Sequence, residues 1–237
     1  MTKKISVIIP AYNEEAFLPE SLAALAAQTF PRDEFEIVVV DNNSTDRTSA
    51  VAAEHGADKV ILELKQGTNQ ARQAGLHASE GRIVAFLDAD CVPPTDWLER
   101  LHTILHENKG EIVAVAGSYK FDAKAGSPLF VFDGLYRWAI LPAMGSVMGK
   151  VFKRGGVLIG GNFATFKKHL EKINGLDTSK VFFGDDAKIA RDLGKIGYVK
   201  FEPRLYVHSS PRRFDREGLV MTNLRYTMHY FKVMMER

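Results

Sequence analysis

The first half of the chain alternates between short apolar runs and amphipathic stretches. Five apolar runs of strand type occur, ISVIIP, EIVVVD, DKVILEL, RIVAFLD and EIVAVAGSY, and stretches with apolar residues at helical spacing separate them. These helical stretches cover Leu18 to Leu25, a segment that starts near Thr45, about 71–78, and Pro94 to His106. Near-continuous apolar strands that alternate with helices are typical of a parallel sheet covered on both faces. We therefore predict an α/β fold with a mostly parallel sheet over residues 1–119.

This alternation breaks after Lys120. The sequence predicts a loop over 122–128, then the aromatic segment LFVFDGLYRW, a strand within GGVLIGGN and a helix from about Asp185 to Lys195. Apolar residues near a helical period predict a last helix over about 216–236. We expect a single domain of residues 1–237, made of a first half (1–119), a smaller lobe (120–210) and a C-terminal helix (211–237).

The overall composition is that of an ordinary globular chain, and it excludes several classes of protein. A net charge of +2 argues against a surface that coats nucleic acid. The single cysteine, Cys91, excludes an internal disulfide and a thiolate zinc cluster, and we interpret it as a small buried residue. The apolar start of the chain stops at Pro10, too early for a signal-peptide core, and the longest uncharged run, Trp138–Gly149, falls short of the roughly 20 residues that span a bilayer. We expect a cytoplasmic protein.

Candidate binding residues follow three of the predicted strands at one edge of the sheet. Pro10, Asp41 and Asp88 each close an apolar strand, and ligands of open α/β sheets bind beyond the carboxyl ends of the strands. The motif FLDAD also sets Asp88 and Asp90 two positions apart, where both can reach one crevice. Paired carboxylates suit a hard divalent cation that bridges diphosphate oxygens. The competing interpretation is a solvated turn before the helix at Pro94.

Two further segments suit a nucleotide. Asp41 leads into the turn NNSTDRT, with Ser44 or Thr45 as the expected helix cap, and an acid there can accept a hydrogen bond from the N–H of a base. Arg72 lies on a helix whose N-terminus, near Gly67, offers free N–H groups to an anion. A capping carboxylate and a surface arginine are the competing interpretations.

The motif FFGDD places Asp185 and Asp186 at a helix N-terminus behind two aromatic residues. The helix dipole keeps an acid there ionised, while apolar neighbours raise its pKa. Such a carboxylate suits the general base that removes a proton from a hydroxyl, and a plain N-cap is the alternative. His208, which ends the run RLYVH, is either a third metal ligand or an ordinary strand-end histidine, and Arg212 beyond it suits a diphosphate.

Taken in order, SVIIPAYNEE, EIVVVDNNSTDRT, GTNQARQAG, FLDAD, GGNFATFKK, INGLD and FFGDD resemble the motifs of the family 2 glycosyltransferases. Each motif is common alone, but together they cover residues 5 to about 210 in the family's order. The resemblance implies the GT-A fold, a Rossmann-like and mostly parallel sheet flanked by helices, with a nucleotide-binding half at 1–119 and an acceptor-facing lobe after it. It also implies a metal-dependent, inverting enzyme that transfers a sugar from a nucleotide-diphosphate sugar to a hydroxyl acceptor, with Mn²⁺ or Mg²⁺ on the diphosphate.

The same resemblance, with the residues described above, implies roles in the site. Asp41 meets the base, Asp90 holds the metal with His208 as a further ligand, and Asp186 is the catalytic base with Asp185 beside it. We expect donor binding from Pro10, Ala11, Tyr12, Glu14, Asp41, Arg72, Asp88, Ala89 and Arg212. A UDP-sugar is favoured as donor. The pair Asn42-Asn43 stands where Asp-Gly is often found, which weakens the preference for uridine, so a GDP-sugar stays open. The Q-x-x-R-W motif of processive synthases is missing, so we expect single-sugar transfer.

Other functions remain open on the sequence. DADCV matches the nucleophile loop of haloacid dehalogenase-like phosphatases, although that loop normally follows the first strand and here three strand–helix units precede it. A non-catalytic nucleotide-sugar-binding protein would keep the pocket and need no base at Asp186. No G-x-G-x-x-G follows the first strand, which argues against a dinucleotide-dependent oxidoreductase.

A separate hypothesis is peripheral contact with a membrane. It rests on the apolar segment Leu129–Met148, with Arg137 among its aromatics, and on the basic C-terminal helix. A lipid-linked acceptor at the inner face of the membrane would account for both, and an internal lid or a dimer surface is the alternative. The acceptor is then a glycan or a lipid-linked molecule of cell-surface glycan or glycolipid synthesis. The oligomeric state does not follow from the sequence.

Overall fold

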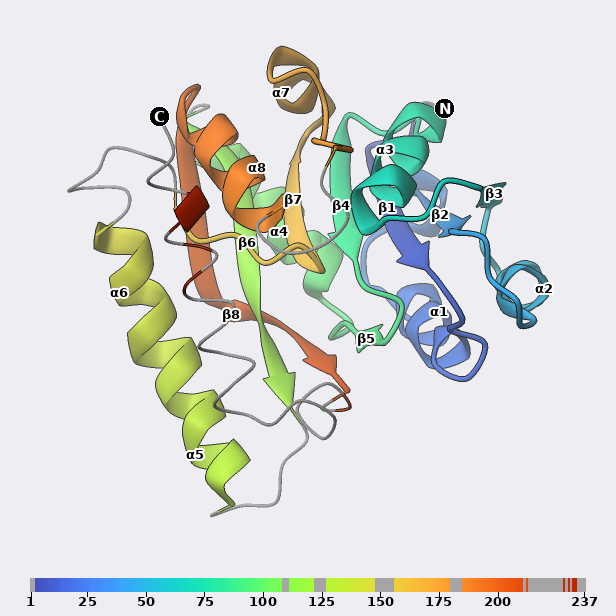
Figure 1. The fold of residues 1–237 in the computed structure, drawn as a ribbon, viewed down its shortest axis with the longest axis horizontal. Helices are drawn as coiled ribbons and strands as arrows, with labels where there is room; N and C mark the ends of the chain where they lie inside the picture. Colours follow the sequence, from blue (N-terminus) through green and yellow to red (C-terminus); the bar gives the residue numbers. More distant parts are fainter. Residues whose placement is uncertain are drawn as a thin grey trace.

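The computed structural model describes residues 3–107, 111–121, 127–147, 156–179 and 185–210, together with residues 212, 228, 230, 232 and 233. Its centre is an eight-stranded sheet with strand order β3-β2-β1-β4-β7-β6-β8-β5 (Figure 1). The strands are β1 (Ile5–Ala11), β2 (Phe35–Asp41), β3 (Lys59–Leu62), β4 (Ile83–Leu87), β5 (Cys91–Val92), β6 (Ile112–Phe121), β7 (Asn162–Phe166) and β8 (Tyr198–Ser209). The helices are α1 (Leu18–Ala26), η1 (Arg32–Glu34), α2 (Thr48–Glu54), α3 (Thr68–Ala78), α4 (Trp97–His106), α5 (Pro128–Leu135), η3 (Tyr136–Ile140), α6 (Leu141–Ser146), α7 (Lys167–Lys172) and α8 (Asp185–Gly194).

The strands β3, β2, β1 and β4 form the parallel part of the sheet, as predicted from the apolar runs. Successive residues of a strand point to opposite faces, so Ile37 and Val39 enter one core while Val38 and Val40 enter another. Helices α1, α2 and α4 supply side chains to the first core, and α3, α7 and α8 supply side chains to the second. Burial on both faces is the reason that these strands are apolar without alternation.

The turn after β2 departs from the prediction. Helix α2 begins at Thr48, and neither Ser44 nor Thr45 caps it. Both residues instead bind the loop after β1, since Ser44 Oγ accepts a hydrogen bond from the Asn13 N–H (3.0 Å) and the Thr45 N–H donates to Asn13 Oδ1 (2.8 Å). The turn therefore joins two strand ends at the sheet's carboxyl edge.

The second half of the sheet is mixed. Strand β7 runs antiparallel to both β4 and β6, while β6 and β8 are parallel and β5 pairs antiparallel with β8. The sequence predicts a strand within GGVLIGGN, but β7 starts only at the last residue of that motif, Asn162. The buried Asn162 amide donates to the Ser118 and Leu205 carbonyls (2.9 and 2.8 Å), and its oxygen accepts from Trp97 Nε1 (3.0 Å). These bonds fix the start of β7 between β6, β8 and α4.

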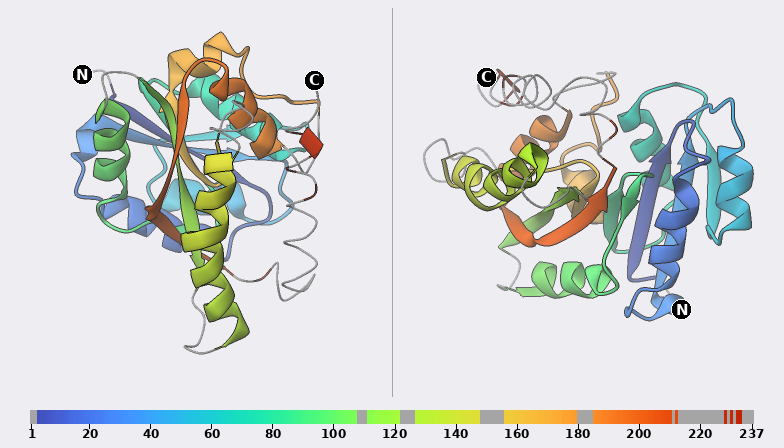
Figure 2. Two further views of the ribbon diagram at one scale, coloured as in Figure 1. Left: turned by 90° about the vertical axis from the view of Figure 1, so that its left-hand side faces the viewer. Right: turned by 90° about the horizontal axis from the view of Figure 1, so that it is seen from below.

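One long helix packs against strands β6 and β8 of the sheet. Helix α5, the π-helical turn η3 and helix α6 follow one another without a break on one side of the molecule, and α5 extends beyond the end of the sheet (Figures 1 and 2). This helix contains most of the segment Leu129–Met148. No helix within the described ranges is both long enough and apolar enough to cross a membrane.

Two smaller predictions can be compared with the structure. Cys91 is buried, as predicted, and burial raises the pKa of its thiol well above the ordinary value. Helix α4 begins at Trp97, three positions after Pro94. The predicted helix at 216–236 lies outside the described residues except for four single positions.

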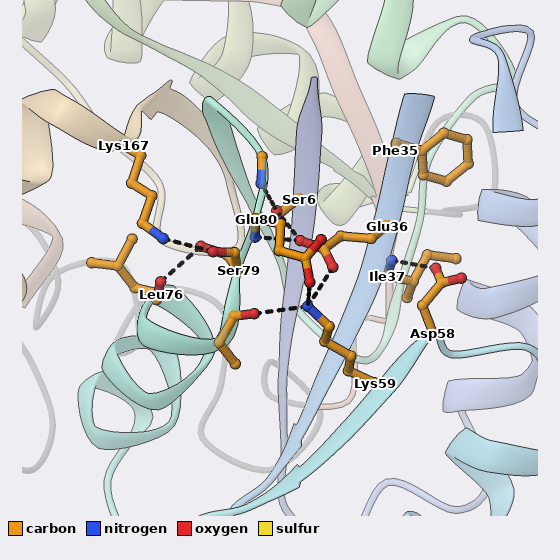
Figure 3. Close-up of polar contacts among 12 residues, drawn as sticks. Ser6, Phe35, Glu36, Ile37, Asp58, Lys59, Leu76, Ser79, Glu80 and Lys167 are labelled. Carbon is orange, nitrogen blue, oxygen red and sulfur yellow. Dashed lines mark hydrogen bonds and ion pairs between the residues drawn. The ribbon is translucent and has the colours of Figure 1, made fainter. Parts of the chain in front are cut away.

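A buried polar cluster holds the opposite edge of the parallel strands together (Figure 3). Glu36, at the start of β2, accepts hydrogen bonds from Ser6 Oγ (2.5 Å) and the Glu80 N–H (2.5 Å), and Lys59 Nζ lies 2.9 Å from its second oxygen. Lys59 also pairs with the Glu80 carboxylate (2.7 Å), and the Gly81 N–H donates to Ser6 Oγ (2.8 Å). The cluster thus ties β1, β2, β3 and the segment between α3 and β4 to one carboxylate.

The pKa of Glu36 reflects two opposing effects, its burial and its polar partners. Burial raises the pKa, but the hydrogen bonds from Ser6 and Glu80 and the charge of Lys59 outweigh it, so the pKa lies below the ordinary value of 4.5. Because the pKa of Glu36 is lower in the folded than in the unfolded state, the ionised carboxylate stabilises the fold. This stabilisation is fully present at pH values above the unfolded-state pKa, and it is lost as the pH falls through the folded-state pKa.

We predict that Glu36→Ala lowers the free energy of unfolding by about 3 kcal/mol near neutral pH, because it leaves Lys59, Ser6 and the Glu80 N–H without their shared partner. Urea denaturation measures the difference, which should narrow in acid. The control is Glu34→Ala, since Glu34 pairs with Lys4 at the surface (2.7 Å) and should change stability by less than about 1 kcal/mol. Equal losses of stability in the two variants would contradict the conclusion that Glu36 holds the buried cluster together.

Candidate functional site

A cavity of about 510 Å³ opens where β1 and β4 end. Polar residues from the strand ends, α3 and α8 line one side, and apolar residues of the helix α5–η3–α6 line the other. The structure brings together most of the predicted site residues there, namely Pro10, Ala11, Tyr12, Glu14, Arg72, Asp88, Ala89, Asp90, Asp185, Asp186 and Arg212. The carboxyl edge of the sheet is therefore the place where the polar motifs converge.

The guanidinium of Arg72 is the centre of this site. Its Nη2 lies 3.3 Å from Asp88 Oδ1, and its Nη1 lies 3.2 Å from Asp185 Oδ2 and 3.6 Å from Asp186 Oδ1. Arg72 is only 3% exposed, so the surface-arginine interpretation is wrong. Although burial favours the neutral form, the charges of Asp88, Asp186 and Asp185 raise the pKa of Arg72. One cation therefore connects α3, the end of β4 and the start of α8.

Asp88 is held in place from three directions. Its Oδ1 faces Arg72, its Oδ2 accepts a hydrogen bond from Tyr119 Oη (2.7 Å), and its N–H donates to the Gly161 carbonyl (3.3 Å). Burial beside Asp88 raises the pKa of Tyr119 well above its ordinary value, so the phenol stays protonated and donates. The carboxylate of Asp88 thus has a fixed orientation.

Asp186, at the N-terminus of α8, is a buried carboxyl with a raised pKa. Burial is the main cause, followed by the charge of Asp185, and both outweigh Arg72 and the hydrogen bond from the Gly160 N–H (3.0 Å). The sequence predicts a raised pKa from apolar neighbours, and the charge of Asp185 is a further cause that the sequence does not indicate. A carboxyl with a raised pKa is a stronger base than an ordinary aspartate once it is ionised.

Asp90 faces a different cation. Arg212 Nε lies 3.1 Å from Asp90 Oδ2, and the same guanidinium pairs with Glu14 and lies over the ring of Phe17, 4.5 Å from its centroid. Burial and the nearby Asp88 raise the pKa of Asp90 to about 6, and Arg212 only partly offsets them. Glu14 keeps a second buried oxygen, Oε2, with no hydrogen-bond partner in the described part of the chain.

The described lining of the cavity carries more acidic than basic side chains. Glu14, Asp88, Asp90, Asp185 and Asp186 face it, against Arg72 and Arg212. Burial raises the pKa values of Asp90 and Asp186, and repulsion between neighbouring carboxylates raises them further. The cavity is therefore suited to bind further positive charge.

Two predicted residues lie outside this lining. Asp41 is buried and bonds within its own turn, to the Ser44 N–H (2.9 Å) and Ser49 Oγ, as a capping carboxylate would. His208 pairs with Val92 across β5 and β8, and its ring lies 5.6 Å from that of Tyr206. Their roles at the base and at a metal stay predictions.

The sequence does not identify several residues that shape the site. Tyr119 lies on β6, within an ordinary apolar strand, and Asn42 is buried and binds the chain before α3 through the Gly67 N–H (2.7 Å). Gly160 and Gly161 differ from these residues, because two successive glycines, as in the motif GGN, indicate that other atoms approach the backbone closely. A Cβ on Gly161 would lie 2.0 Å from Asp88 Oδ2, and one on Gly160 would lie 2.2 Å from Asp186 Oδ1. Both glycines are needed because the backbone passes directly beside the two carboxylates.

The chain is similar to a known family of proteins. The family model described as Glycosyl transferase family 2 matches residues 6–173. Among curated relatives, the glycosyltransferase AglE of Haloferax volcanii is 43% identical over 101 residues, which are 40% of this chain and 33% of the relative. The probable glycosyltransferase YdaM of Bacillus subtilis is 28% identical over 213 residues, 84% of this chain and 49% of the relative. The chain spans less than half the length of each of these two proteins.

Solved structures show the same fold at low sequence identity. The mannosyltransferase PcManGT from Pyrobaculum calidifontis, in complex with GDP-Man and Mn²⁺, has a TM-score of 0.77 at 22% identity and matches 100% of this chain and 66% of its own. Glucosyl-3-phosphoglycerate synthase from Mycobacterium tuberculosis, in complex with Mn²⁺, UDP-glucose and phosphoglyceric acid, has a TM-score of 0.61 at 22% identity, with 95% of this chain and 80% of its own covered.

We predict that Gly161→Ala displaces Asp88, because the new methyl group would overlap its carboxylate. Overpacking of this kind lowers the free energy of unfolding by about 1–3 kcal/mol, measured by urea denaturation. The control is Gly134→Ala in α5, where nothing lies within 4 Å of the added Cβ. A helical glycine replaced by alanine should be neutral or stabilising by up to about 1 kcal/mol. Unchanged stability of Gly161→Ala would show that the site tolerates the methyl group.

Proposed function

Because the chain belongs to glycosyl transferase family 2, we propose that it transfers one sugar from a nucleotide-diphosphate sugar to a hydroxyl acceptor with inversion at the anomeric carbon. A UDP-sugar is favoured as donor, and a GDP-sugar is the alternative. The proposal rests on one observation. Asp88 and Asp90, which follow β4, and Asp186, at the start of α8, line the same cavity. The GT-A fold, which the sequence predicts, accounts for this convergence of strand-end and helix-end residues.

Asp186 is the proposed catalytic base. In one in-line displacement, the acceptor oxygen forms a bond to the anomeric carbon, the bond from that carbon to the diphosphate oxygen breaks, and the hydroxyl proton passes to Asp186. A single displacement inverts the anomeric centre. The raised pKa of Asp186 suits this step, since the ionised carboxylate then takes up a proton readily. Arg72 and the Gly160 N–H hold the carboxylate in position.

The residues near Asp90 fit a divalent cation bound with substrate. Among the described residues, no three His, Cys, Asp or Glu side chains form a complete metal site. Mg²⁺, however, is usually held by one or two carboxylates together with substrate phosphates and water, and Asp90, with Asp88 beside it, supplies such carboxylates. The orphaned Glu14 Oε2 and the acidic excess of the cavity also favour added cation. Mn²⁺ or Mg²⁺ held by Asp90 would neutralise the charge of the departing diphosphate.

The remaining donor contacts follow from the same geometry. Pro10, Ala11 and Tyr12 line the cavity at the end of β1, and Asp41 closes the neighbouring strand β2. We propose that they receive the nucleoside, with Asp41 at the base and Asp88 with Ala89 at the ribose. Arg212 then pairs with the diphosphate, for which a guanidinium has matching geometry.

The acceptor side of the cavity is apolar. Phe132, Tyr136, Leu141 and Met144 come from the helix α5–η3–α6, and Leu158 comes from the segment before β7. Such a wall suits an acceptor with an apolar portion, so we propose a glycan or lipid-linked acceptor of cell-surface glycan or glycolipid synthesis. The enzyme would then act in the cytoplasm or at the inner face of the membrane.

The alternatives differ in what they require. Membership of the transferase family argues against the phosphatase, whose nucleophile would be Asp88. Both carboxylate oxygens of Asp88 are moreover already bonded, one to Arg72 and the other to Tyr119. A nucleotide-sugar-binding protein without activity needs the same cavity but no catalytic base. Substitution of Asp186 distinguishes the two, because only the enzyme loses activity through it.

We predict that Asp186→Asn lowers kcat by at least about 100-fold, the usual contribution of a general base, and leaves the KM for the donor within a few-fold. Release of nucleoside diphosphate during transfer is the readout. The matched control is Asp192→Asn on the same helix, which pairs with Lys188 and Lys195 and does not line the cavity. Full activity of the Asp186→Asn variant would contradict the role of Asp186 as catalytic base.

The pH profile of kcat follows from the same residue. Since the pKa of Asp186 is raised and the base must be ionised, kcat should rise with pH through that pKa and level off above it. Initial rates at saturating donor measure the profile. A kcat that is independent of pH from acid to neutral would contradict Asp186 as the base.

We predict that Asp90→Asn weakens metal-dependent nucleotide binding by about 10–100-fold, because an amide is a poorer ligand than a carboxylate. The measurement is the thermal shift produced by UDP, and separately by GDP, in the presence of MnCl₂, since a tight ligand stabilises by mass action. The control is Asp96→Asn, a surface residue paired with Arg100 (2.6 Å). Wild-type protein that takes up neither nucleotide with metal would overturn the donor assignment.

A further inference from the structure

A second cavity, of about 570 Å³, lies at the amino ends of β1 and β4, the opposite edge of the sheet from Asp88. Lys4 and Ile83 contribute to its wall from these strand ends, His106 from the end of α4 and Glu171 from α7. The two cavities share no lining residue. A cavity of this volume is within the range of sites that hold small molecules. It is therefore a candidate for a second binding site.

The wall of this second cavity is rich in cationic and imidazole side chains. They are Lys4, Arg82, His102, His106, Lys167 and Lys168. Arg82 and Lys168 are exposed, and neither forms an ion pair with a carboxylate among the described residues. Lys168 Nζ lies over the Phe166 ring, 5.3 Å from its centroid. Lys167 Nζ donates to a neutral partner, the Ser79 carbonyl (2.6 Å; Figure 3), and keeps two further N–H donors. Three cations in the wall can therefore pair with an anion.

The carboxylates of the wall do not balance these charges. Glu80 is paired with Lys59 (2.7 Å), which lies outside the lining. Lys4 is paired with Glu34 (2.7 Å), which also lies outside it. In the described lining, only Glu171 then remains against the three cations. The cavity thus keeps a net positive charge, in contrast to the acidic cavity at the other edge of the sheet.

The two histidines of α4 lie in this positive field. Their ring centroids are 4.2 Å apart, and His106 Nδ1 donates to the His102 carbonyl (2.7 Å). Burial, followed by the charges of His106 and Lys4, lowers the pKa of His102. Because Nδ1 of His106 is already bonded, its Nε2 is the ring atom that can meet a ligand.

We propose that this cavity binds a phosphate-bearing small molecule, with its phosphate group between Arg82, Lys167 and Lys168. A guanidinium matches the geometry of phosphate oxygens, and ammonium groups add charge-assisted hydrogen bonds. A phosphate ester carries close to two negative charges near neutral pH, and a diphosphate can carry more. Such an anion offsets three cations more fully than a single carboxylate does.

The second site goes beyond the proposed function, because it requires neither the sugar donor nor the metal ion. Its test is isothermal titration calorimetry of the full chain with inorganic pyrophosphate as the probe, in EDTA. Without a divalent ion, the acidic excess of the donor cavity should keep pyrophosphate out of it. We expect one binding event that weakens as salt is added. The variant Arg212→Gln, which removes a cation of the donor cavity, should bind the probe as the wild type does.

The double variant Arg82→Gln, Lys168→Gln should weaken pyrophosphate binding by at least about tenfold, because two charge-assisted contacts are lost. Its thermal melting should stay unchanged, since both side chains are exposed. The matched control is Arg47→Gln, Lys195→Gln, which removes the same charge at side chains 68% and 66% exposed, outside the cavity. The control should bind pyrophosphate as the wild type does.

Three results would overturn the proposal. The first is wild-type protein that takes up no pyrophosphate. The second is an equal loss of binding in the Arg47, Lys195 control, which would make the effect one of net charge. The third is a loss of binding in Arg212→Gln but not in the Arg82, Lys168 variant, which would place the probe in the donor cavity. None of these results bears on the transfer reaction, which the Asp90 and Asp186 variants test separately.

Discussion

The structure of the site depends on one buried cation shared by three carboxylates. Arg72 comes from α3, its partner Asp88 follows β4, and Asp185 and Asp186 begin α8, more than a hundred residues further along the chain. A buried guanidinium requires such partners, because burial without them would cost several kcal/mol. Its partners require it equally, since without it three carboxylates would face one another. At the site, one set of charges therefore joins the first and second halves of the chain.

The parallel half of the fold could be predicted from the sequence, because strands buried on both faces leave unbroken apolar runs such as that of β2. The second half could not. The placement of β7 beside β4 depends on backbone pairing with distant residues and on the hydrogen bonds of Asn162, and no local pattern of apolar residues records either. The late start of α2 has a similar cause, since Ser44 and Thr45 bond with Asn13, thirty-one and thirty-two positions away.

In the site, the sequence indicates the acidic residues but not their partners. Asp90 and Asp186 could be singled out because they follow a strand and begin a helix, two positions with known chemical consequences. The burial of Arg72 and the contact from Tyr119 result from tertiary packing, so an arginine on a helix and a tyrosine on a strand carry no local sign of them. The motif GGN does carry one, since two successive glycines indicate that other atoms approach the backbone closely.

The helix α5–η3–α6 has one face in the cavity and another in solvent. Phe132 and Tyr136 line the cavity. Their neighbours in sequence, Val131 and Leu135, are exposed on the outer side. Neighbouring positions on a helix are separated by about 100° of rotation. A turn of the helix by a single position would thus bring Val131 and Leu135 into the places that Phe132 and Tyr136 occupy in the cavity wall. The Asp133–Arg137 pair, which lies against Tyr206, and the buried Leu141 favour this rotational register. A pair of charges on the inner side of the helix therefore helps to decide which of its side chains line the cavity.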